Sequence, residues 1–400
     1  MVTWLMHSST QEFRRVSDTP VCIESTTLKV ILGSQLTEDF NGPNQEGFGG
    51  YAHTAYNGQR SSSSHCFLRP ISDRENLTVL TSTLTHRCLI DHKNTCYGIE
   101  VSNSSRIRKS KKSQKIFANE VVLCGGAINT PQLLLLSGIG PKRELEALGI
   151  HCNLHLPGVG KNLQDHLQVG ITYNCKQPIT LLRYQLTSWF EMRKWIRDPM
   201  SAPLVAASPV PVGGFSRIYP NDDIPNMQHH FVLAEVRDHG RKPFFKHRYG
   251  SHLCTLQPLS KGEITLKTSN PHDHPIINPK SLSNEQDLFD FVEAFKHTRK
   301  VFTQSALDDF NAGEYSPGNN IETDDEIATW LRQNLYTCYH PVSTARIGTD
   351  DMSVCDTNFK IKSIRGLRAA DASVMPDLIS GNTNAPTMML AEMCAIEMQK

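Results

Sequence analysis

The segment EVVLCGGAINTPQLLLLSGIGP, residues 120–141, decides the fold. Its first five residues form a mostly apolar run that is typical of a buried strand. Gly125 and Gly126 follow, and glycine permits the backbone conformations that a tight turn needs. The apolar run beyond them predicts a helix with Pro131 in its first turn, where the missing N–H of proline leaves no hydrogen bond unmade. The segment therefore predicts a strand–turn–helix junction, the repeating unit of α/β folds.

The residues before this junction predict β-structure. Residues 76–90 (NLTVLTSTLTHRCLI) and 96–104 (CYGIEVSNS) are rich in β-branched side chains and predict two strands. Further upstream, Asn57 and Gly58 form an Asn-Gly pair that favours a tight hairpin turn. The N-terminal part of the chain is therefore expected to contain hairpins.

The residues after the junction show a different pattern of predicted elements, and the end of the chain then returns to the strand–turn–helix order. Residues 170–335 alternate short strands with Pro-, Asn- and His-rich turns, and they predict helices at 287–304 and 324–331. The apolar positions of the first of these helices fit one face: 288, 291, 292, 295 and 302. The last 65 residues return to the strand–turn–helix order, with GLRAADASVMP at 366–376 and GNTNAPTMMLAEMCAIEMQK at 381–400.

These patterns predict a fold of class α/β (α+β) in which one lobe is interrupted by another. We assign residues 1–168 to the first lobe. Residues 169–335 are assigned to an inserted lobe with an antiparallel sheet and helices. Residues 336–400 return the chain to the first lobe.

Composition and charge exclude several classes of protein. The 400 residues carry 41 Lys and Arg against 40 Asp and Glu, a net charge of +1, which argues against a dedicated nucleic-acid binder. Charged residues at 20% and hydrophobic residues at 38% are typical of a folded chain. The longest apolar run is far too short to span a bilayer, so we expect a soluble protein.

The cysteines and histidines show no metal-site pattern. Eleven cysteines include no CxxC pair, so zinc ribbons and thioredoxin-like sites lose support. Cys124 and Cys394 lie in apolar runs and are expected to be small buried hydrophobes. His229 and His230 have no third ligand at metal-site spacing, so no metal is expected. Because the N-terminus lacks the pattern of a signal peptide, we expect a reducing, cytoplasmic compartment.

Four segments together resemble one family, the glucose–methanol–choline (GMC) flavoprotein oxidoreductases. They are GGAINTPQLLLLSGIGP at 125–141, LPGVGKNLQDH at 156–166, YHPVSTARIG at 339–348 and LRAADASVMPDLISGNTNAPTMMLAE at 367–392. Alone, each of the first two is typical of an ordinary turn leading into a helix or loop. The resemblance covers about residues 39–400, and it implies an FAD-binding lobe that is discontinuous in sequence plus a substrate lobe.

The resemblance implies two catalytic residues. His340 matches the general base of the family and precedes Pro341, which holds the backbone extended. Imidazole suits this role because its ordinary pKa lies near neutral pH. Asn382 matches a second active-site position, where an amide can hydrogen-bond the substrate oxygen. Taken alone, Asn382 is also typical of a turn.

The resemblance also implies a set of FAD-binding positions: Thr85, Gly126, Asn129, Asp371, Ala372, Asn384 and Thr387. Asp371 and Ala372 are expected to meet the ribityl chain and the pyrophosphate. Asn384 and Thr387 are expected to cap the last helix beneath the isoalloxazine ring. Thr85 takes the place of an adenine-contacting position whose contact is made by the backbone.

The sequence departs from the family pattern in one major respect. It contains no GxGxxG, the turn whose helix N-terminus holds the pyrophosphate of a dinucleotide. The resemblance therefore implies an FAD-binding lobe that lacks its N-terminal βαβ unit, in a chain truncated at that end. Smaller departures follow the expected base: Ser343, Ala345 and Ile347.

The function implied by the resemblance is the FAD-dependent oxidation of a primary alcohol to an aldehyde, with electrons passed to a quinone or another acceptor. The segments DHGRK at 238–242 and LSKGEITLKTSNP at 259–271 are most similar to choline dehydrogenases and bacterial aliphatic alcohol dehydrogenases. One alternative is a catalytically inactive remnant unable to hold FAD, and another is a family member with lyase activity. The basic residues at 106–115 are typical of a solvated hairpin tip; a peripheral contact with the inner face of a membrane is the functional alternative.

Overall fold

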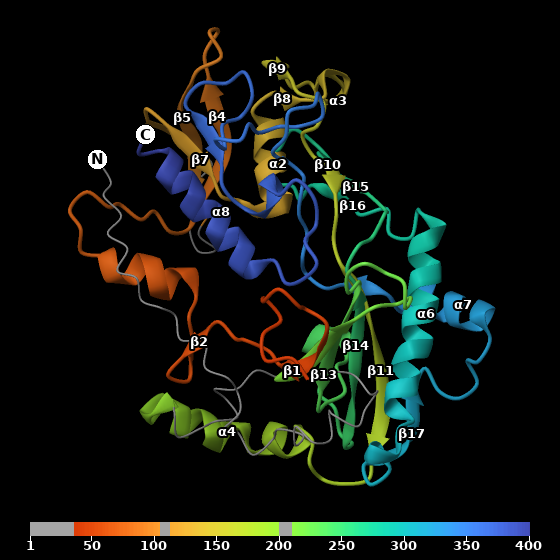
Figure 1. The fold of residues 1–400 in the computed structure, drawn as a ribbon. Coiled ribbons are helices and arrows are strands. Elements are labelled where there is room, and N and C mark those ends of the chain that lie inside the picture. Colours follow the sequence, from red (N-terminus) through yellow and green to blue (C-terminus); the bar gives the residue numbers. More distant parts are fainter. Residues whose placement is uncertain (1–35, 105–112, 200–209) are drawn as a thin grey trace. The chain divides into compact units, whose positions relative to one another are not determined.

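A computed structural model describes residues 36–104, 113–199 and 210–400. The chain divides into two compact units. The first unit contains residues 1–78, 168–254 and 290–335, and the second contains residues 79–167, 255–289 and 336–400. Figure 1 shows the elements of both along the chain.

The second unit is built on the junction that the sequence predicts. Strand β7 (Val121–Leu123) leads into helix α2 (Gly126–Leu136). β7 pairs in parallel with β19 (Leu367–Ala369), so that Val121 lies opposite Leu367 and Leu123 opposite Ala369. A 3-10 helix (Ala372–Val374) follows β19 as α2 follows β7. Both parallel strands therefore end at the same edge, with a turn after each.

An antiparallel sheet of three strands accompanies this pair. Its order is β4 (Thr83–Ile90), β5 (Cys96–Asn103) and β6 (Gln114–Phe117). The predicted strand at 76–90 was seven residues too long, because Ser82 has a left-handed φ of +52° that breaks the extended chain. Val79 and Leu80, before that break, are 53% and 54% exposed, so the packing of their side chains does little to stabilise a strand there.

Helix α2 begins at Gly126, farther ahead of Pro131 than the sequence predicts. Pro131 is the sixth residue of the helix, so the prediction that it lies in the first turn was wrong. Inside a helix, proline leaves the carbonyl four residues earlier without its usual donor. The hydroxyl of Thr344, fully buried, donates to that carbonyl, on Ala127, at 2.6 Å. A side chain from a distant loop thus replaces the missing backbone hydrogen bond.

The core of the second unit collects apolar side chains from these elements. Its members with at most 2% exposure include Cys96, Leu134, Leu135, Ile139, Leu145, Val159, Phe359, Ile361 and Leu367. Cys394, on helix α8 (Asn384–Glu397), joins this core as predicted. Cys124 does not: it is exposed, because it follows the last residue of β7 at the edge of the sheet.

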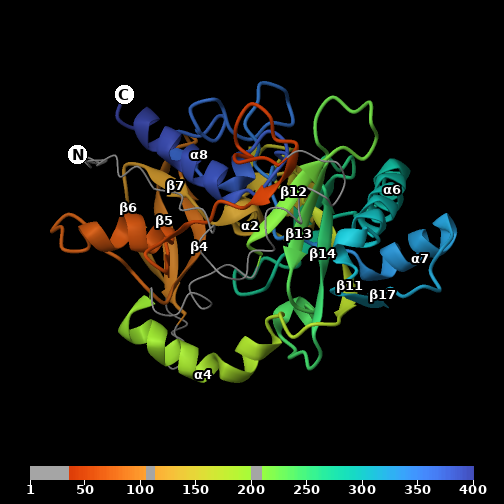
Figure 2. The same ribbon diagram turned by 60° about the horizontal axis from the view of Figure 1, so that its bottom comes forward.

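The first unit is built on an antiparallel sheet with the order β1, β12, β13, β14, β11, β17. The bounds are β1 (Gly47–Gly50), β12 (Val212–Ser216), β13 (Met227–Val232), β14 (Arg248–Thr255), β11 (Leu167–Cys175) and β17 (Asn311–Ser316). Figure 2 shows β12, β13, β14 and β11 side by side, with the helices α6 and α7 to the right of them. An antiparallel sheet with helices is what the sequence predicts for its middle part.

Both predicted helices of this region are present. α6 (Glu285–Phe302) buries the five predicted apolar positions: Leu288, Phe291, Val292, Phe295 and Phe302. α7 (Asp324–Asn334) begins at a capping box in which Thr323 and Glu326 exchange hydrogen bonds. Helix α4 (Leu182–Arg197) is held in part by Trp195, whose indole N–H donates to the carbonyl of Gly58 at 2.8 Å.

The remaining elements are short. The predicted Asn-Gly hairpin joins β2 (Ala55–Tyr56) to β3 (Gln59–Arg60), with φ of +46° at Asn57 and +69° at Gly58. The others are β8 (Ile139–Gly140), α3 (Lys142–Ala147), β9 (Leu154–His155), β10 (Lys161–Leu163), β15 (Gly262–Thr265), β16 (Ile276–Asn278) and β18 (Tyr336–Thr337), with short helical turns at Ser64–Leu68, Arg69–Ile71, Asp238–Gly240 and Ser305–Leu307. Among the described residues, none of the helices has the length and apolar character needed to cross a membrane.

Candidate active site

The loop that carries His340 is held by the side chain of Asp165. One carboxylate oxygen accepts the backbone N–H of His340 at 2.8 Å, and the other accepts the hydroxyl of Thr337. Burial raises the pKa of Asp165, while the hydrogen bonds from Thr337 and from the His340 backbone act against that rise. Asp165 therefore fixes where the main chain of this loop lies.

The neighbouring residue, His166, meets the ring of His340. The two Nδ1 atoms are 2.9 Å apart, and the rings cross at 86° with their centroids 5.2 Å apart. The other ring nitrogen of His166, Nε2, lies 3.1 Å from the carbonyl oxygen of Leu256. The His166 carbonyl in turn accepts the N–H of Cys338 at 2.7 Å. Both imidazoles are buried, with His166 fully so.

Asn382 occupies the other side of the His340 ring. Its amide nitrogen Nδ2 lies 3.1 Å from His340 Nε2. The structure thus brings together the two residues that the sequence predicts to be catalytic, although 42 positions separate them in the chain. A basic ring nitrogen and an amide donor within hydrogen-bond distance can together hold one hydroxyl group.

The predicted cofactor residues of the junction lie at the carboxyl ends of β7 and β19. Gly126 has φ of +76°, and a Cβ added there would meet nothing within 4 Å, so open space adjoins its backbone. Asp371 accepts the N–H of Gly126 at 2.9 Å, the hydroxyl of Thr130 at 2.6 Å and the N–H of Ser373 at 2.7 Å. Such an edge, with a glycine turn and a helix N-terminus, fits a dinucleotide.

The other predicted cofactor residues are distributed over the same unit. Thr85 lies in β4, directly before a bulge. Asn129, on α2, donates through Nδ2 to the side chain of Gln132 at 2.9 Å. Ala372 begins the 3-10 helix after β19. These placements leave the predicted contacts with FAD as predictions.

The predicted cap of the last helix was wrong. The residue that caps α8 is Thr383, and its side chain makes no capping hydrogen bond. Asn384 is already the first helical residue. Thr387 donates its hydroxyl to the carbonyl of Thr383 at 2.6 Å, which is the bond of a residue inside the helix. The helix therefore begins at Asn384, the residue that was predicted to cap it.

Sequence reasoning missed Asp165 and His166. Both lie at the end of LPGVGKNLQDH, which was recognised as a segment without a role for any single side chain. The available signal was the pairing of a carboxylate with a second histidine in a loop rich in glycine. Their partners, at 337–340, are more than 170 residues away in the sequence.

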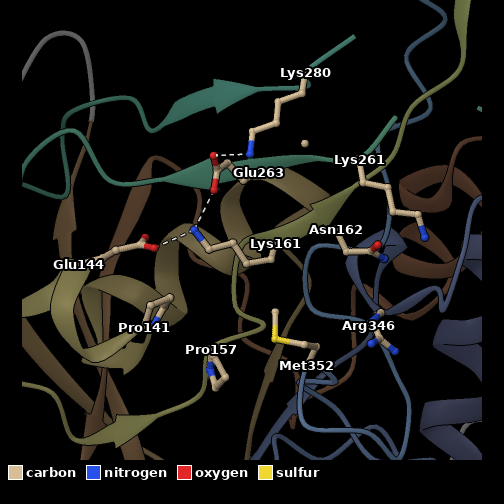
Figure 3. Close-up of a pocket in the computed structure, with 11 residues that line it drawn as sticks. Pro141, Glu144, Pro157, Lys161, Asn162, Lys261, Glu263, Lys280, Arg346 and Met352 are labelled. Atoms are coloured by element: carbon tan, nitrogen blue, oxygen red, sulfur yellow. Dashed lines mark hydrogen bonds and ion pairs between the residues drawn. The ribbon is translucent and has the colours of Figure 1, made fainter. Parts of the chain in front are cut away.

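A separate pocket of about 580 Å³ also lies in the second unit (Figure 3). Its charged lining residues are Glu144, Lys161, Lys261, Glu263, Lys280 and Arg346. Every lining cation has a carboxylate partner. Lys161 pairs with Glu144 and Glu263, each at 2.8 Å, and Lys280 pairs with Glu263 at 2.9 Å. Outside the lining, Asp377 holds Lys261 and Asp350 holds Arg346. None of the predicted site residues lines this pocket.

Two further sequence predictions concern histidines and a basic segment. Within the parts of the chain that the structure describes, no group of three or more His, Cys, Asp or Glu side chains could hold a metal ion. His229 is instead a buried residue of β13: burial, with smaller effects of His297 and His230, lowers its pKa to about 3. Of the basic residues at 106–115, those up to 112 lie outside the described residues.

Comparisons with known proteins agree on one family. Family models described as GMC oxidoreductase match residues 30–168 and 258–391. Mitochondrial choline dehydrogenase of Mus musculus is 39% identical over 371 residues, which cover 91% of this chain and 60% of that protein. An oxygen-dependent choline dehydrogenase of Yersinia pseudotuberculosis is 36% identical over 386 residues, 95% of this chain and 67% of that protein. This chain therefore spans about two thirds or less of the length of these relatives.

Solved structures share the fold. A formate oxidase of Aspergillus oryzae gives a TM-score of 0.86 at 24% identity, with 95% of this chain and 70% of that chain covered. A pyridoxine 4-oxidase of Mesorbium loti gives a TM-score of 0.81 at 24% identity, with 97% and 71% covered. At this identity the likeness concerns the fold, and it agrees with the predicted mixture of helices and antiparallel sheets.

Proposed function

The chain belongs to the GMC oxidoreductase family, and from this premise we propose that it oxidises a primary alcohol to an aldehyde with FAD as the hydride acceptor. The observation that carries the proposal is the pair of His340 and Asn382, whose Nε2 and Nδ2 atoms lie 3.1 Å apart. A base and a hydrogen-bond donor at one point are what removal of a hydroxyl proton requires.

His340 and Asn382 have different roles at the substrate oxygen. A substrate hydroxyl that replaces Asn382 at the lone pair of His340 Nε2 can donate its proton there, while its oxygen accepts a hydrogen bond from Asn382 Nδ2. As His340 takes the proton, a C–H bond breaks on the carbon that bears the hydroxyl group, and its electron pair leaves with the hydrogen as hydride. The C–O bond becomes the carbonyl of the aldehyde. FAD, when bound, supplies the acceptor for that hydride. Asn382 stabilises the charge that develops on the oxygen during the transfer.

The residues at the carboxyl ends of β7 and β19 are the ones proposed to hold FAD. The open space at Gly126 admits a group close to the backbone, and Asp371 keeps the two turns together. Ala372 lies in the second of these turns. Thr85, Asn129, Asn384 and Thr387 are retained as predicted contacts on the resemblance to the family. The assignment of residues 1–168 and 336–400 to the cofactor lobe and 169–335 to the substrate lobe is likewise a proposal.

The names of the relatives guide the choice of substrate. Because the most similar curated proteins reported above are choline dehydrogenases, choline and simple aliphatic alcohols are the first candidates. For the electron acceptor we propose a quinone or a similar carrier, with a peripheral membrane contact where the acceptor is a membrane quinone.

The test is spectroscopic. The purified chain is incubated with FAD, freed of unbound cofactor and inspected for flavin absorbance at about 450 nm, then mixed without oxygen with choline and a series of primary alcohols. We expect retained flavin that loses its colour with at least one alcohol. A protein that retains no flavin overturns the proposal and favours an inactive remnant. Retained flavin that no alcohol bleaches, in a chain that cleaves a substrate without redox change, favours a lyase.

A further inference from the structure

The ring of His340 is hydrogen-bonded at both of its nitrogens. Nδ1 lies 2.9 Å from His166 Nδ1, and Nε2 lies 3.1 Å from Asn382 Nδ2. A neutral imidazole carries a proton on only one nitrogen, and the other nitrogen holds the lone pair that can act as a base. Which nitrogen of His340 is basic therefore depends on its two neighbours.

The carbonyl of Leu256 decides the state of His166. A carbonyl oxygen can only accept, so His166 Nε2, 3.1 Å away, carries a proton and donates it. In neutral His166 the remaining nitrogen, Nδ1, then has a lone pair and accepts. The proton between the two Nδ1 atoms consequently belongs to His340.

We infer that His166 is a positioning residue that fixes the tautomer of His340, with a proton on Nδ1 and the lone pair on Nε2. The inference rests on the proposed role of His340 as the base. Asn382 agrees with it, because its amide nitrogen is a donor and requires an acceptor at His340 Nε2. The chain of hydrogen bonds from Leu256 through His166 thus aims the basic nitrogen of His340 at the substrate side.

The opposite tautomer is disfavoured at both nitrogens. A proton on His340 Nε2 would face the N–H of Asn382, so that two donors would meet. The lone pair left on Nδ1 would face the lone pair of His166, so that two acceptors would meet. Both imidazoles are buried, where unmade hydrogen bonds are costly because water cannot replace the partner.

His166 also suits the state that follows proton transfer. Once His340 holds protons on both nitrogens, its Nδ1–H still donates to the lone pair of His166, so the cation keeps its partner. This is the role that a buried hydrogen-bond acceptor behind a catalytic histidine plays in general: it sets the tautomer and stabilises the imidazolium.

The test compares two substitutions, one that keeps the hydrogen-bonding capacity of His166 and one that removes it. In His166→Gln, the side-chain amide can still donate to Leu256 and its oxygen can still accept from His340, so we expect the tautomer to be kept. In His166→Leu, a side chain of similar size offers neither. The exposed His151→Gln is the control, since that residue lies on the surface of the same unit.

The readout is the nitrogen-15 NMR spectrum of the full chain labelled at histidine, which distinguishes protonated from bare ring nitrogens without turnover. We expect a bare Nε2 on His340 in the wild type, in His166→Gln and in the control, and a mixture of tautomers in His166→Leu. A protonated Nε2 in the wild-type spectrum overturns the inference, whatever the variants show. The test therefore does not depend on whether His166→Leu folds. An unchanged His340 tautomer in folded His166→Leu also overturns it.

Kinetics add a second readout and separate this inference from the proposed function. With FAD and alcohol, we expect His166→Leu to lower kcat by about 10²–10³-fold with little change in KM, and His166→Gln to restore most of it. A wild-type chain that shows the expected tautomer but oxidises no alcohol supports the inference and counts against the proposed function. An active chain with a protonated Nε2 overturns the inference alone.

Discussion

At the scale of single residues, Asp165 determines the position of His340, the proposed base, through the main chain. Its carboxylate accepts the N–H of His340 and the hydroxyl of Thr337. In Asp165→Ala both contacts are lost and the loop can move. Because displacements of about 1 Å at a reacting group can cost about 10²-fold, we predict a 10- to 100-fold lower kcat, measured by steady-state kinetics of the FAD-loaded chain.

The control for this substitution is Asp351→Ala, which removes an exposed carboxylate from the same unit. It is expected to leave kcat within about twofold, as surface substitutions usually do. Equal kcat values for Asp165→Ala and the wild type would show that the loop needs no support from Asp165.

His340 and Asn382 could be predicted from the sequence because each lies in a segment that resembles a family motif. Asp165 and His166 could not be assigned in the same way, although their segment was recognised. Their significance lies in contacts to residues 337–340 and to Leu256, and a single sequence does not reveal which distant side chains meet. The tautomer inferred for His340 depends on these contacts between residues that are distant in the sequence.

At the scale of secondary-structure elements, helix α2 depends on a loop for one of its hydrogen bonds. Thr344 donates to the carbonyl of Ala127, which Pro131 leaves without a backbone donor. Thr344→Val keeps the shape of the side chain and removes the hydroxyl. We predict a loss of about 1–3 kcal/mol in the free energy of unfolding, the cost of an unsatisfied buried carbonyl, measured by urea denaturation.

A double-mutant cycle distinguishes this cause from a general packing defect. In Pro131→Ala, the new backbone N–H can serve the carbonyl of Ala127. Thr344→Val is then expected to cost clearly less in the Pro131→Ala background than in the wild type. An identical cost in both backgrounds would contradict the account.

The elements themselves followed the sequence well where periodicity or turn chemistry was strong. The buried face of α6, the start of α7 at Asp324 and the Asn-Gly hairpin agree with the predictions. The errors fell at element ends. β4 starts at Thr83 because of the left-handed Ser82, and α8 starts at Asn384 without a side-chain cap. Such boundaries depend on tertiary contacts that local propensity does not encode.

At the scale of the whole molecule, buried histidines make stability depend on pH. His229 is fully buried in the first unit, and burial lowers its pKa to about 3 from an ordinary value of 6.5. Below pH 6.5, His229 binds a proton in the unfolded chain but not in the folded chain. The free energy of unfolding therefore falls as the pH falls. One such group contributes about 1.4 kcal/mol per pH unit, and its effect is complete near the folded pKa.

His229→Gln removes this titrating group while keeping a neutral polar side chain. We predict that the pH dependence of the unfolding free energy between pH 6.5 and 4.5 becomes shallower by about that slope, measured by urea denaturation at several pH values. The exposed His151→Gln is the control for the replacement of a histidine outside the core. Equal slopes for His229→Gln and the wild type would show that His229 accepts a proton in the folded state.

The general architecture was predicted because the junction at residues 120–141 and the closing segments have strong local patterns. The details of the division into units were not accessible, since residues 255–289 join elements far from them in sequence. The family that the sequence motifs imply is the family that the comparisons show. The chain spans 60% of the length of its mouse relative. The proposed oxidation depends above all on one side chain, His340, which we propose as the base.

The most direct test of this role is the rate at which alcohol reduces the FAD-loaded chain in a stopped-flow instrument, measured for the wild type and for His340→Ala. We predict that His340→Ala lowers this rate by about two to four orders of magnitude, because the lone pair that accepts the hydroxyl proton is removed. Equal rates in the two proteins would show that His340 is not the base.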